Sequence, residues 1–301
     1  MGTEMSAVPL VRASIRAPVR VVIRAACAIR ADADGRLDES AFVKERRAPK
    51  VGALTDKARM VLAAAARVLP EGTAREGGRP AGVSLGTLHG SMDAAALCLR
   101  AVRSEGFGSV TPSWYAAGLA NATAAAIAAV LGLRGPNLTL LGHQAGLDAI
   151  IAACRQIAVG RAGAMLAGGF DLPCDAFAGQ LAAAGLCPPG VRVEPGAGLL
   201  HLSAAAEGEP GAASVLAWSQ SAAAGLDVPE TVDRLMTAAG ASGTPRVHVV
   251  RAGQAGRVDR LAAAAPILLA GEVLGRGAPG LHALVARGYG RQTAGLLIEK
   301  T

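Results

Sequence analysis

The stretch GLRGPNLTLLGHQAGLDAIIAACRQIAVGRAGAMLAGG, residues 132–169, decides the fold. Its apolar run LTLLG is short and strand-like, and it follows the turn-forming residues Gly135-Pro136-Asn137. A helix is expected at residues 145–158, because apolar side chains recur on one stripe from Leu147 to Ile157. The run AGAMLAGG then completes a strand-helix-strand unit, whose parallel strands need the helix as a crossover.

Similar elements are expected on both sides of this segment. Helices are predicted at residues 55–69, 91–102 with Ser91 as the cap, 121–133 and 230–239, and FGSVTPSWYAAG is interpreted as a loop. Strands are predicted at residues 19–29, in AGVSLGT and, later, in GAGLLHLSAA, ASVLAWSQSA, TPRVHVVRA, APILLA and QTAGLLIEK. The pattern indicates an α/β protein with a poorly ordered start, 1–17, and two halves, 1–190 and 191–301, around one joined core.

Composition and charge exclude several classes of function. The 301 residues are 51% hydrophobic and 3% aromatic, so the chain can bury a large core but offers few rings on which nucleic-acid bases could stack. Thirty Lys and Arg against 23 Asp and Glu give a net charge of +7, and these charges are scattered, so no nucleic-acid partner is expected. The uncharged stretch 116–133 is mostly Ala and Gly and contains Asn121 and Thr123, which favours an interior helix over a membrane span.

The cysteines and histidines form no metal or disulfide pattern. The five cysteines include no CxxC pair and no signal peptide is recognised, which indicates reduced thiols in a cytoplasm. The five histidines show neither HxxxH nor HExxH spacing, so no metal site is expected. The sequence contains no GxxxxGK[ST] loop, and no cofactor is expected.

Residues 132–169 resemble the nucleophile region of the β-ketoacyl synthases, which belong to the thiolase superfamily. Other pieces resemble the same family in the same order: VSLGTLHGSMDAAALCLRAV and TPSWYAAGLANATAAAIAAVLGLRGPN before this region, and VEPGAGLLHLSAA, PILLAGEVLG and GYGRQTAGLLIE after it. Each of these matches alone is weak evidence for the family. The resemblance rests on their occurring in the family's order along residues 83–299. It implies a layered αβαβα fold of thiolase type, built from two related halves and trimmed relative to ordinary ketosynthases.

The resemblance implies decarboxylative condensation, for which the family acylates a cysteine at a helix N-terminus. Counting along the strand from Asn137 places this cysteine position on Gln144, whose amide can neither ionise nor carry a thioester. Counting backwards from the GRA turn places the position on His143 instead. The match of QAG and LDA to the family on both sides of a one-residue gap favours Gln144.

The family also uses two histidines and a lysine to stabilise the oxyanion formed by decarboxylation. The first histidine position falls on Gly253, the lysine position on Ile267 and the second histidine position on Glu272. An anionic carboxylate at residue 272 would repel a forming enolate. The resemblance therefore implies an active site that has lost its catalytic residues.

One branch of the family, the chain-length factors, has such losses as its normal state, with glutamine in a QAGGLDA context at the cysteine position. This chain has Gln144-Ala145-Gly146-Leu147-Asp148-Ala149, which is one glycine shorter. The resemblance implies a non-catalytic subunit that forms a heterodimer with an active ketosynthase, shapes its acyl pocket, and contacts an acyl carrier protein weakly, in type II polyketide or fatty-acid-like biosynthesis. The family pairs through the strand before the elbow, which here comprises Leu138, Thr139, Leu140, Leu141 and Gly142.

Several alternatives remain open at this point. Gln144 could serve only to bond backbone at the helix start, and the strand at residues 138–142 could be buried within one monomer. A glutamine-type malonyl-carrier decarboxylase, an enzyme, is the second functional hypothesis. Gly253 and Glu272 argue against it, because such decarboxylases keep the histidines. An activity based on His143 is a further alternative.

Overall fold

The computed structural model describes residues 14–38, 54–188, 191–206, 209–221, 226–252, 258–289 and 292–301. Its strands are β1 (Ser14–Arg30), β2 (Arg75–Glu76), β3 (Arg79–Thr87), β4 (Asn137–Leu141), β5 (Ala164–Asp171), β6 (Arg192–Val193), β7 (Gly196–Ala204), β8 (Ala213–Ser221), β9 (Arg246–Arg251), β10 (Val258–Asp259), β11 (Gly280–Arg287) and β12 (Thr293–Lys300). Its α-helices are α1 (Asp56–Val68), α2 (Met92–Glu105), α3 (Pro112–Ala117), α4 (Ala122–Leu131), α5 (Ala145–Ala158), α6 (Asp175–Ala183), α7 (Val228–Ala239) and α8 (Ala264–Leu268). Short helical turns are η2 (Phe107–Ser109), η3 (Leu261–Ala263) and the π-helical η4 (Leu269–Arg276).

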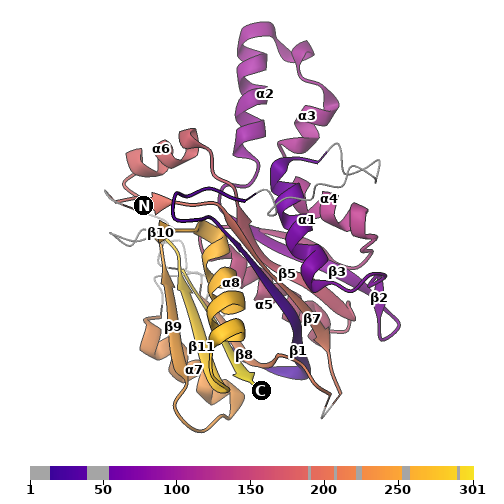
Figure 1. Ribbon diagram of the computed structural model, residues 1–301, viewed down its shortest axis with the longest axis vertical. Helices are drawn as coiled ribbons and strands as arrows, with labels where there is room; N and C mark the ends of the chain where they lie inside the picture. Colours follow the sequence, from indigo (N-terminus) through magenta and orange to yellow (C-terminus); the bar gives the residue numbers. More distant parts are fainter. Residues whose placement is uncertain are drawn as a thin grey trace, which may run out of the picture.

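Ten strands form one mixed sheet (Figure 1). Their order is β2-β3-β5-β7-β1-β8-β12-β11-β9, with β4 paired to the other strands only through β3. Strand β3 is parallel to both β4 and β5, so the predicted strand-helix-strand unit is present with β3 lying between its two strands. The long strand β1 links two parts of the sheet, because it pairs antiparallel with β7 along one edge and with β8 along the other.

Helices and strands stack in five layers. Helices α1 and α4 cover the outer face of β3, β5 and β7, and α7 covers the outer face of β8, β11 and β12. Helices α5 and α8 lie between these two parts of the sheet, in the largest apolar core (Figure 1). The predicted stripe of α5 enters this core, with Leu147, Ile150 and Ile151 fully buried. This arrangement confirms the expected α/β class and the αβαβα layering.

Local signals account for the ends of several helices. Thr55 caps α1, with its side chain accepting a hydrogen bond from the backbone N–H of Ala58 at 3.3 Å. Gly132 ends α4 in the left-handed region, at φ +66°. Helix α5 spans the predicted residues 145–158. Ser91 occupies the N-cap position of α2 as expected, but its side chain makes no capping hydrogen bond.

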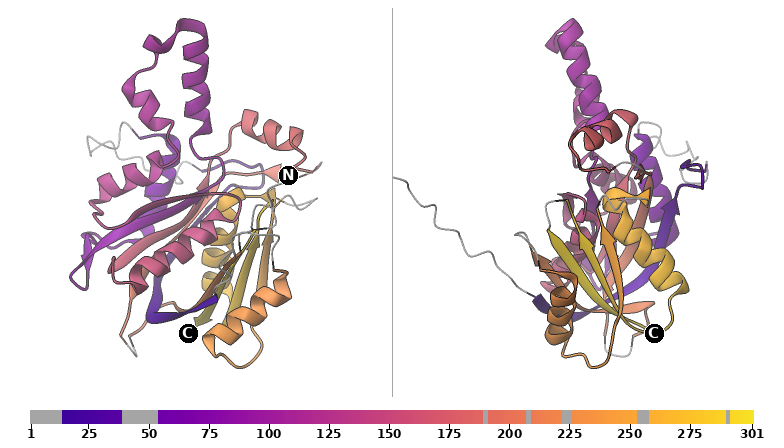
Figure 2. Two further views of the ribbon diagram at one scale, coloured as in Figure 1. Left: turned by 180° about the vertical axis from the view of Figure 1, so that it is seen from behind. Right: turned by 90° about the vertical axis from the view of Figure 1, so that its left-hand side faces the viewer.

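The structure corrects the expected loop between α2 and α4. Residues Pro112–Ala117 form α3, where Thr111 caps Trp114 N–H at 3.4 Å and proline occupies the first turn. Helices α2 and α3 project together away from the layered body (Figure 2). Within the described ranges, every helix is too short or too polar to traverse a lipid bilayer.

The strands differ from the expectations in three further places. The run APILLA is helical, in α8 and the start of η4, because a short apolar segment buried on all sides has no period that separates helix from strand. Strand β1 starts at Ser14, before the predicted residues 19–29, and residues 14–16 pair with β8. Strand β11 was not predicted, and it pairs antiparallel with β12 and parallel with β9.

Candidate functional site

The turn between β4 and α5 carries both candidate positions for the family's nucleophile. Gly142 has φ +143°, a conformation that favours glycine, and the chain then passes through His143 and Gln144 into α5. The first turn of α5 packs closely on the C-terminal half, since a β-carbon on Gly146 would lie 2.0 Å from the carbonyl oxygen of Ala262. The turn is therefore held between β4 and η3.

Gln144 immediately precedes α5 and belongs to a network of amides around Asp148. Its side chain and that of Gln220 both hydrogen-bond to the Asp148 carboxylate. Burial raises the pKa of Asp148, and these two hydrogen bonds oppose that shift. The Gln144 Oε1 atom is buried and has no hydrogen-bond partner among the described residues, and it lies against Gly288, where a β-carbon would approach it to 2.3 Å.

His143 faces a different set of partners. Its buried Nε2 lies 2.9 Å from Asp259 Oδ1, and Asp259 Oδ2 accepts a hydrogen bond from the Tyr289 hydroxyl at 3.0 Å. The rings of His143 and Tyr289 contact each other edge-on, with centroids 5.1 Å apart. Burial, and then the Asp259 carboxylate, raise the pKa of Tyr289. Sequence reasoning weighed His143 alone and missed Asp259 and Tyr289, which lie more than 100 residues away along the chain.

A second buried carboxylate, Asp171 at the end of β5, was also missed. It accepts hydrogen bonds from the Thr87 hydroxyl at 2.6 Å, from the backbone N–H groups of Leu88 and His89, and from Ala262 N–H at 3.0 Å. Burial raises its pKa to about 6, although these donors oppose the shift. The carboxylate of Asp171 thus connects the loop after β3 to η3. In the sequence, the one feature that could have indicated this role is an acidic residue at the end of an apolar strand.

The residues predicted for the family's lysine and second histidine positions, Ile267 and Glu272, lie on α8 and η4. Ile267 is 3% exposed and packs against Gly196. Glu272 forms an ion pair with Arg30 at 2.9 Å, and this hydrogen bond holds the pKa of Glu272 below its usual range. The carboxylate therefore faces a guanidinium. Gly253, the first histidine position, lies outside the described residues.

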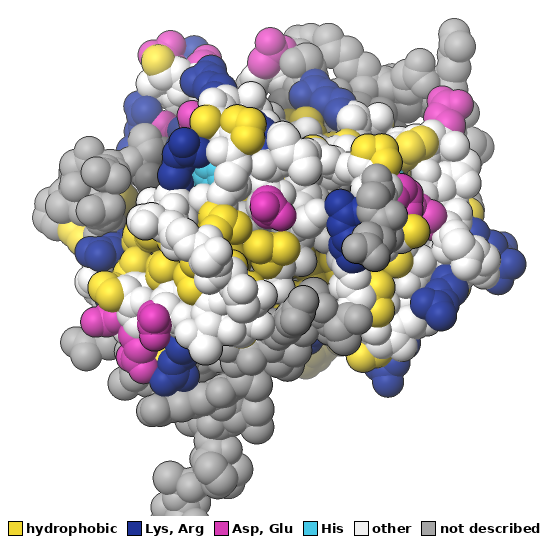
Figure 3. Space-filling view, turned by 90° about the horizontal axis from the view of Figure 1, so that it is seen from below, with side chains coloured by type: hydrophobic (Ala, Val, Ile, Leu, Met, Phe, Trp, Pro, Cys, Tyr) yellow, Lys and Arg dark blue, Asp and Glu magenta, His cyan; other side chains and the backbone are white. Residues whose placement is uncertain are grey.

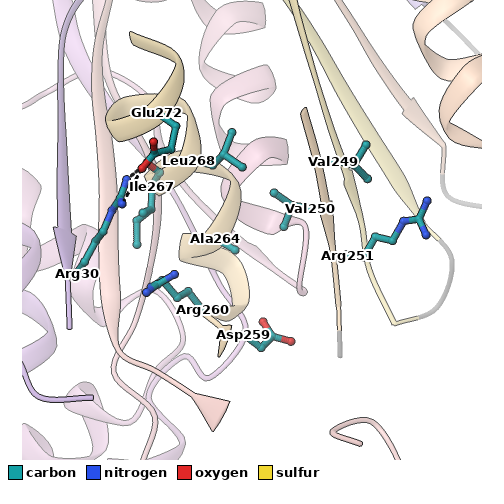
Figure 4. A pocket seen from close by; sticks show the side chains of 10 residues that line it. All are labelled: Arg30, Val249, Val250, Arg251, Asp259, Arg260, Ala264, Ile267, Leu268 and Glu272. Atoms are coloured by element: carbon teal, nitrogen blue, oxygen red, sulfur yellow. Dashed lines mark hydrogen bonds and ion pairs between the residues drawn. The ribbon is translucent and has the colours of Figure 1, made fainter. Parts of the chain in front are cut away.

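A cavity of about 270 Å³ brings two of the four predicted positions together (Figure 4). Ile267 and Glu272 line it, with the pair of Arg30 and Glu272 at one end and Asp259 toward the other. Gln144 is not among its lining residues. Asp259 both borders this cavity and binds His143.

Among the described residues, metal-ligating side chains are not clustered, and charges of both signs are mixed on the face in Figure 3. In the described parts of the chain, no group of three or more His, Cys, Asp or Glu side chains could hold a metal ion. The space-filling view from below shows Lys and Arg interspersed with Asp and Glu, between areas of hydrophobic side chains (Figure 3). The net charge of +7 is thus not concentrated on this face.

Strand β4, the predicted interface strand, lies at the edge of the sheet. Among the described strands it pairs only with β3, so its other edge is open. Leu138, Thr139 and Leu140 are half-buried, and the Leu141 side chain is 63% exposed. The alternative in which the strand is buried within one monomer therefore does not hold at Leu141, whose side chain is exposed.

An apolar groove lies between α2 and α3. It encloses about 550 Å³ and is lined by Ala95, Cys98, Leu99, Val102, Phe107, Val110, Tyr115, Gly118 and Leu119. None of the residues of α2 is buried, and the Phe107 side chain is 87% exposed. Exposed apolar surface of this extent is typical of a binding site for a partner or a ligand.

Comparison with known proteins identifies the family. The sequence model of the N-terminal domain of β-ketoacyl synthases matches residues 15–190, which is more than half of the chain. The chain belongs to the β-ketoacyl synthase family. No curated protein matches it in sequence.

Solved structures of the β-ketoacyl synthase family share the fold. The ishigamide ketosynthase/chain length factor matches with a TM-score of 0.73 and 20% identity, covering 93% of this chain and 99% of that chain. A chain of AntDE:AntF, a type II PKS acyl-carrier protein in complex with its ketosynthase bound to the hexaketide, matches with a TM-score of 0.69 and 16% identity, over 94% and 100% of the two chains. A β-ketoacyl synthase from Burkholderia phymatum STM815 matches with a TM-score of 0.67 and 15% identity, covering 94% of this chain and 100% of that chain. At these identities the likeness establishes the thiolase-like fold.

Proposed function

We propose that this chain is a chain-length-factor-like subunit, without catalytic activity of its own, that pairs with an active ketosynthase in type II polyketide or fatty-acid-like biosynthesis. The observation that carries the proposal is the open edge of β4, which lies directly before the turn with His143 and Gln144, the two residues predicted for the family's cysteine position. An open edge presents unpaired backbone N–H and C=O groups, and another strand can satisfy them.

The surroundings of this edge support pairing with a protein surface. The exposed Leu141 and the apolar groove between α2 and α3 both offer hydrophobic area, and burying it stabilises a complex by roughly 25 cal/mol per Å². In this proposal the turn at Gln144 and the groove shape the partner's acyl pocket. Because this contact with the ketosynthase would bury mainly apolar surface, we expect its strength not to depend on salt concentration.

The proposed lack of intrinsic catalysis rests on the side chains at the positions predicted for the family's catalytic residues. The amide of Gln144 provides no nucleophile, and Ile267 provides no ammonium group. The carboxylate of Glu272 is engaged by Arg30 and could not donate a hydrogen bond to an oxyanion.

An acyl carrier protein is the second proposed partner. A net charge of +7 attracts an acidic protein, but charges scattered over 301 residues are screened beyond about 8 Å at physiological salt. We therefore expect weak, salt-sensitive contact with the carrier, and we place both interactions in the cytoplasm.

Co-expression with a ketosynthase taken from neighbouring genes of the same genome tests the proposal. The wild-type chain should co-purify with that ketosynthase in both low and high salt. Leu141→Asp should abolish co-purification, because a carboxylate would enter the apolar contact beside β4. Val247→Asp is the matched control, since Val247 is 46% exposed on the edge strand β9, and this variant should co-purify normally.

Two results would replace the proposal. A soluble monomer that binds no ketosynthase would remove the partner role. Steady release of carbon dioxide from malonyl-carrier by the isolated chain, lost in Gln144→Ala, would instead favour the glutamine-type decarboxylase.

A further inference from the structure

We propose that the cavity between β9 and the helices α8 and η4 binds a small carboxylate with a short apolar tail, and that Arg260 holds the carboxylate group. The cavity has a volume of about 270 Å³, the volume of roughly nine water molecules, so it suits a compact organic molecule. Strand β9 ends the sheet on one side, whereas β4, the strand of the proposed ketosynthase contact, joins it near the other side. The inference is therefore independent of the proposed function.

Apolar side chains form the middle of the cavity. Val249 and Val250 come from β9, and Ala264, Ile267 and Leu268 come from α8. Figure 4 shows the side chains of Val249, Val250 and Leu268 around the space between the strand and the helix. Side chains of this kind form no hydrogen bonds, so the middle of the cavity favours an alkyl tail over a sugar or a peptide.

The two carboxylates that line the cavity already have partners within the chain. Asp259 Oδ1 lies 2.9 Å from His143 Nε2, and Asp259 Oδ2 accepts a hydrogen bond from the Tyr289 hydroxyl at 3.0 Å. Glu272 forms its ion pair with Arg30 at 2.9 Å. Because both acidic groups are engaged by the protein itself, the cavity does not require a cation or a hydrogen-bond donor from a ligand.

The guanidinium groups, in contrast, retain donors without an acceptor. Arg260 donates from Nη2 to Glu194 Oε2 at 3.0 Å, but its Nε–H group is buried and no described residue accepts a hydrogen bond from it. Arg251 also lines the cavity, and in the described part of the chain no carboxylate pairs with it. A guanidinium can only donate, and leaving a buried donor without an acceptor is unfavourable. An anionic oxygen is the acceptor that satisfies it best.

The charge of the lining favours a ligand with one negative charge. Three guanidinium groups against two carboxylates leave one positive charge, which a carboxylate balances and a phosphate monoester exceeds. The stem of Arg260 lies alongside Ile267, since a β-carbon on Gly196 would be 2.7 Å from Ile267 Cδ1 and 4.0 Å from Arg260 Cδ. The carboxylate group therefore binds at Arg260, and the tail lies along Ile267 and the apolar middle of the cavity.

Titration of the full chain with hexanoate tests the proposal, with binding followed by ligand-observed NMR at pH 7. Hexanoate should bind saturably, with a Kd on the order of 1 mM, which is typical of the affinity that so small a ligand can reach. Hexanamide has the same tail but no charge, and it should bind at least about tenfold more weakly because it loses the charge-assisted hydrogen bonds to the guanidinium.

Two variants and a matched control locate the site. Arg260→Met keeps an unbranched stem but removes the guanidinium, and it should raise the Kd for hexanoate by about tenfold or more. Arg192→Met is the control, because Arg192 pairs with the same Glu194 but its side chain is 52% exposed and does not line the cavity, so the Kd should stay unchanged. Ala264→Leu places a larger side chain in the cavity from a half-buried position, and it should prevent binding without touching the pair of Arg260 and Glu194.

Several results would overturn the proposal: no saturable binding of hexanoate, equal affinity for hexanoate and hexanamide, or an unchanged Kd in Arg260→Met. If circular dichroism shows that Arg260→Met does not fold, the comparison of the two ligands and the Ala264→Leu variant decide the matter. Co-purification with a ketosynthase does not depend on this cavity. Failure of hexanoate to bind would therefore remove this inference and leave the proposed partner role to its own test.

Discussion

Replacement of Gly146 by alanine should destabilise the protein, although alanine is the better helix former. Gly146 is the second residue of α5, and a β-carbon there would lie 2.0 Å from the carbonyl oxygen of Ala262 and 2.8 Å from Pro266 Cγ, whereas ordinary contacts begin at 3.4 Å. The nearest atom belongs to the backbone and cannot rotate away. Helix α5 and η3 must therefore separate by more than an ångström.

Two opposing free energies decide the sign. Alanine in a helix gains roughly 0.5–1 kcal/mol over glycine. Overpacking a core costs roughly 1–3 kcal/mol, and the upper end applies here because movement of Ala262 also strains its 3.0 Å hydrogen bond to Asp171. The expected net loss is about 2 kcal/mol, which lowers the midpoint of urea unfolding by about 1 M.

Gly179→Ala is the matched control. Gly179 lies in α6 and is exposed, and no neighbouring atom comes within 4 Å of the place a β-carbon would take, so only the helix propensity changes. This variant should gain roughly 0.5–1 kcal/mol in the free energy of unfolding. The reasoning is refuted if urea titrations find Gly146→Ala as stable as the wild type while Gly179→Ala is stabilised.

Three further changes have definite expected outcomes. Lys300→Met should lower the free energy of unfolding in urea by about 2 kcal/mol, because the ammonium group donates to three backbone carbonyls around the end of η4. Asp171 has a native pKa raised from 3.8 to about 6, so the native state binds its proton more tightly than the unfolded state does. Relative to Asp171→Asn, the wild type should therefore lose stability as the pH rises from about 4 to 6 and change no further above 7, and a constant difference across pH 4–7 would contradict this. Tyr289→Phe removes a donor to Asp259 and should cost about 1 kcal/mol in thermal unfolding, so an unchanged Tm would show that this hydrogen bond is not formed in solution.

Much of the N-terminal half could be predicted from the sequence. Helix α5 and its buried stripe follow from a 3.6-residue period that contiguous residues carry by themselves, and Gly132 and Thr55 signal helix ends through their own backbone and side-chain chemistry. The order of the motifs along the chain was sufficient to indicate the β-ketoacyl synthase family, which the match over residues 15–190 shows.

The candidate site could be predicted only in part. The sequence indicated Gln144, Ile267 and Glu272, and the structure places the last two, but not Gln144, among the residues that line one cavity. The partner of Glu272 is Arg30, which is 242 residues away, and no local pattern connects the two. The roles of these positions remain predictions, to be decided by the experiments above.

Tertiary structure alone decided whether APILLA is helix or strand, which edge of the sheet stays open, and which polar groups meet. The residues of α8 are apolar on every side, so only the space between two parts of the sheet selects a helix there. The contacts of His143 with Asp259, and of Lys57 and Cys174 with His89, join segments from 32 to 116 residues apart. Local sequence determines the period and the ends of an element, because those depend on neighbouring residues. The pairing of distant side chains depends on how the layers pack, and packing is a property of the whole chain.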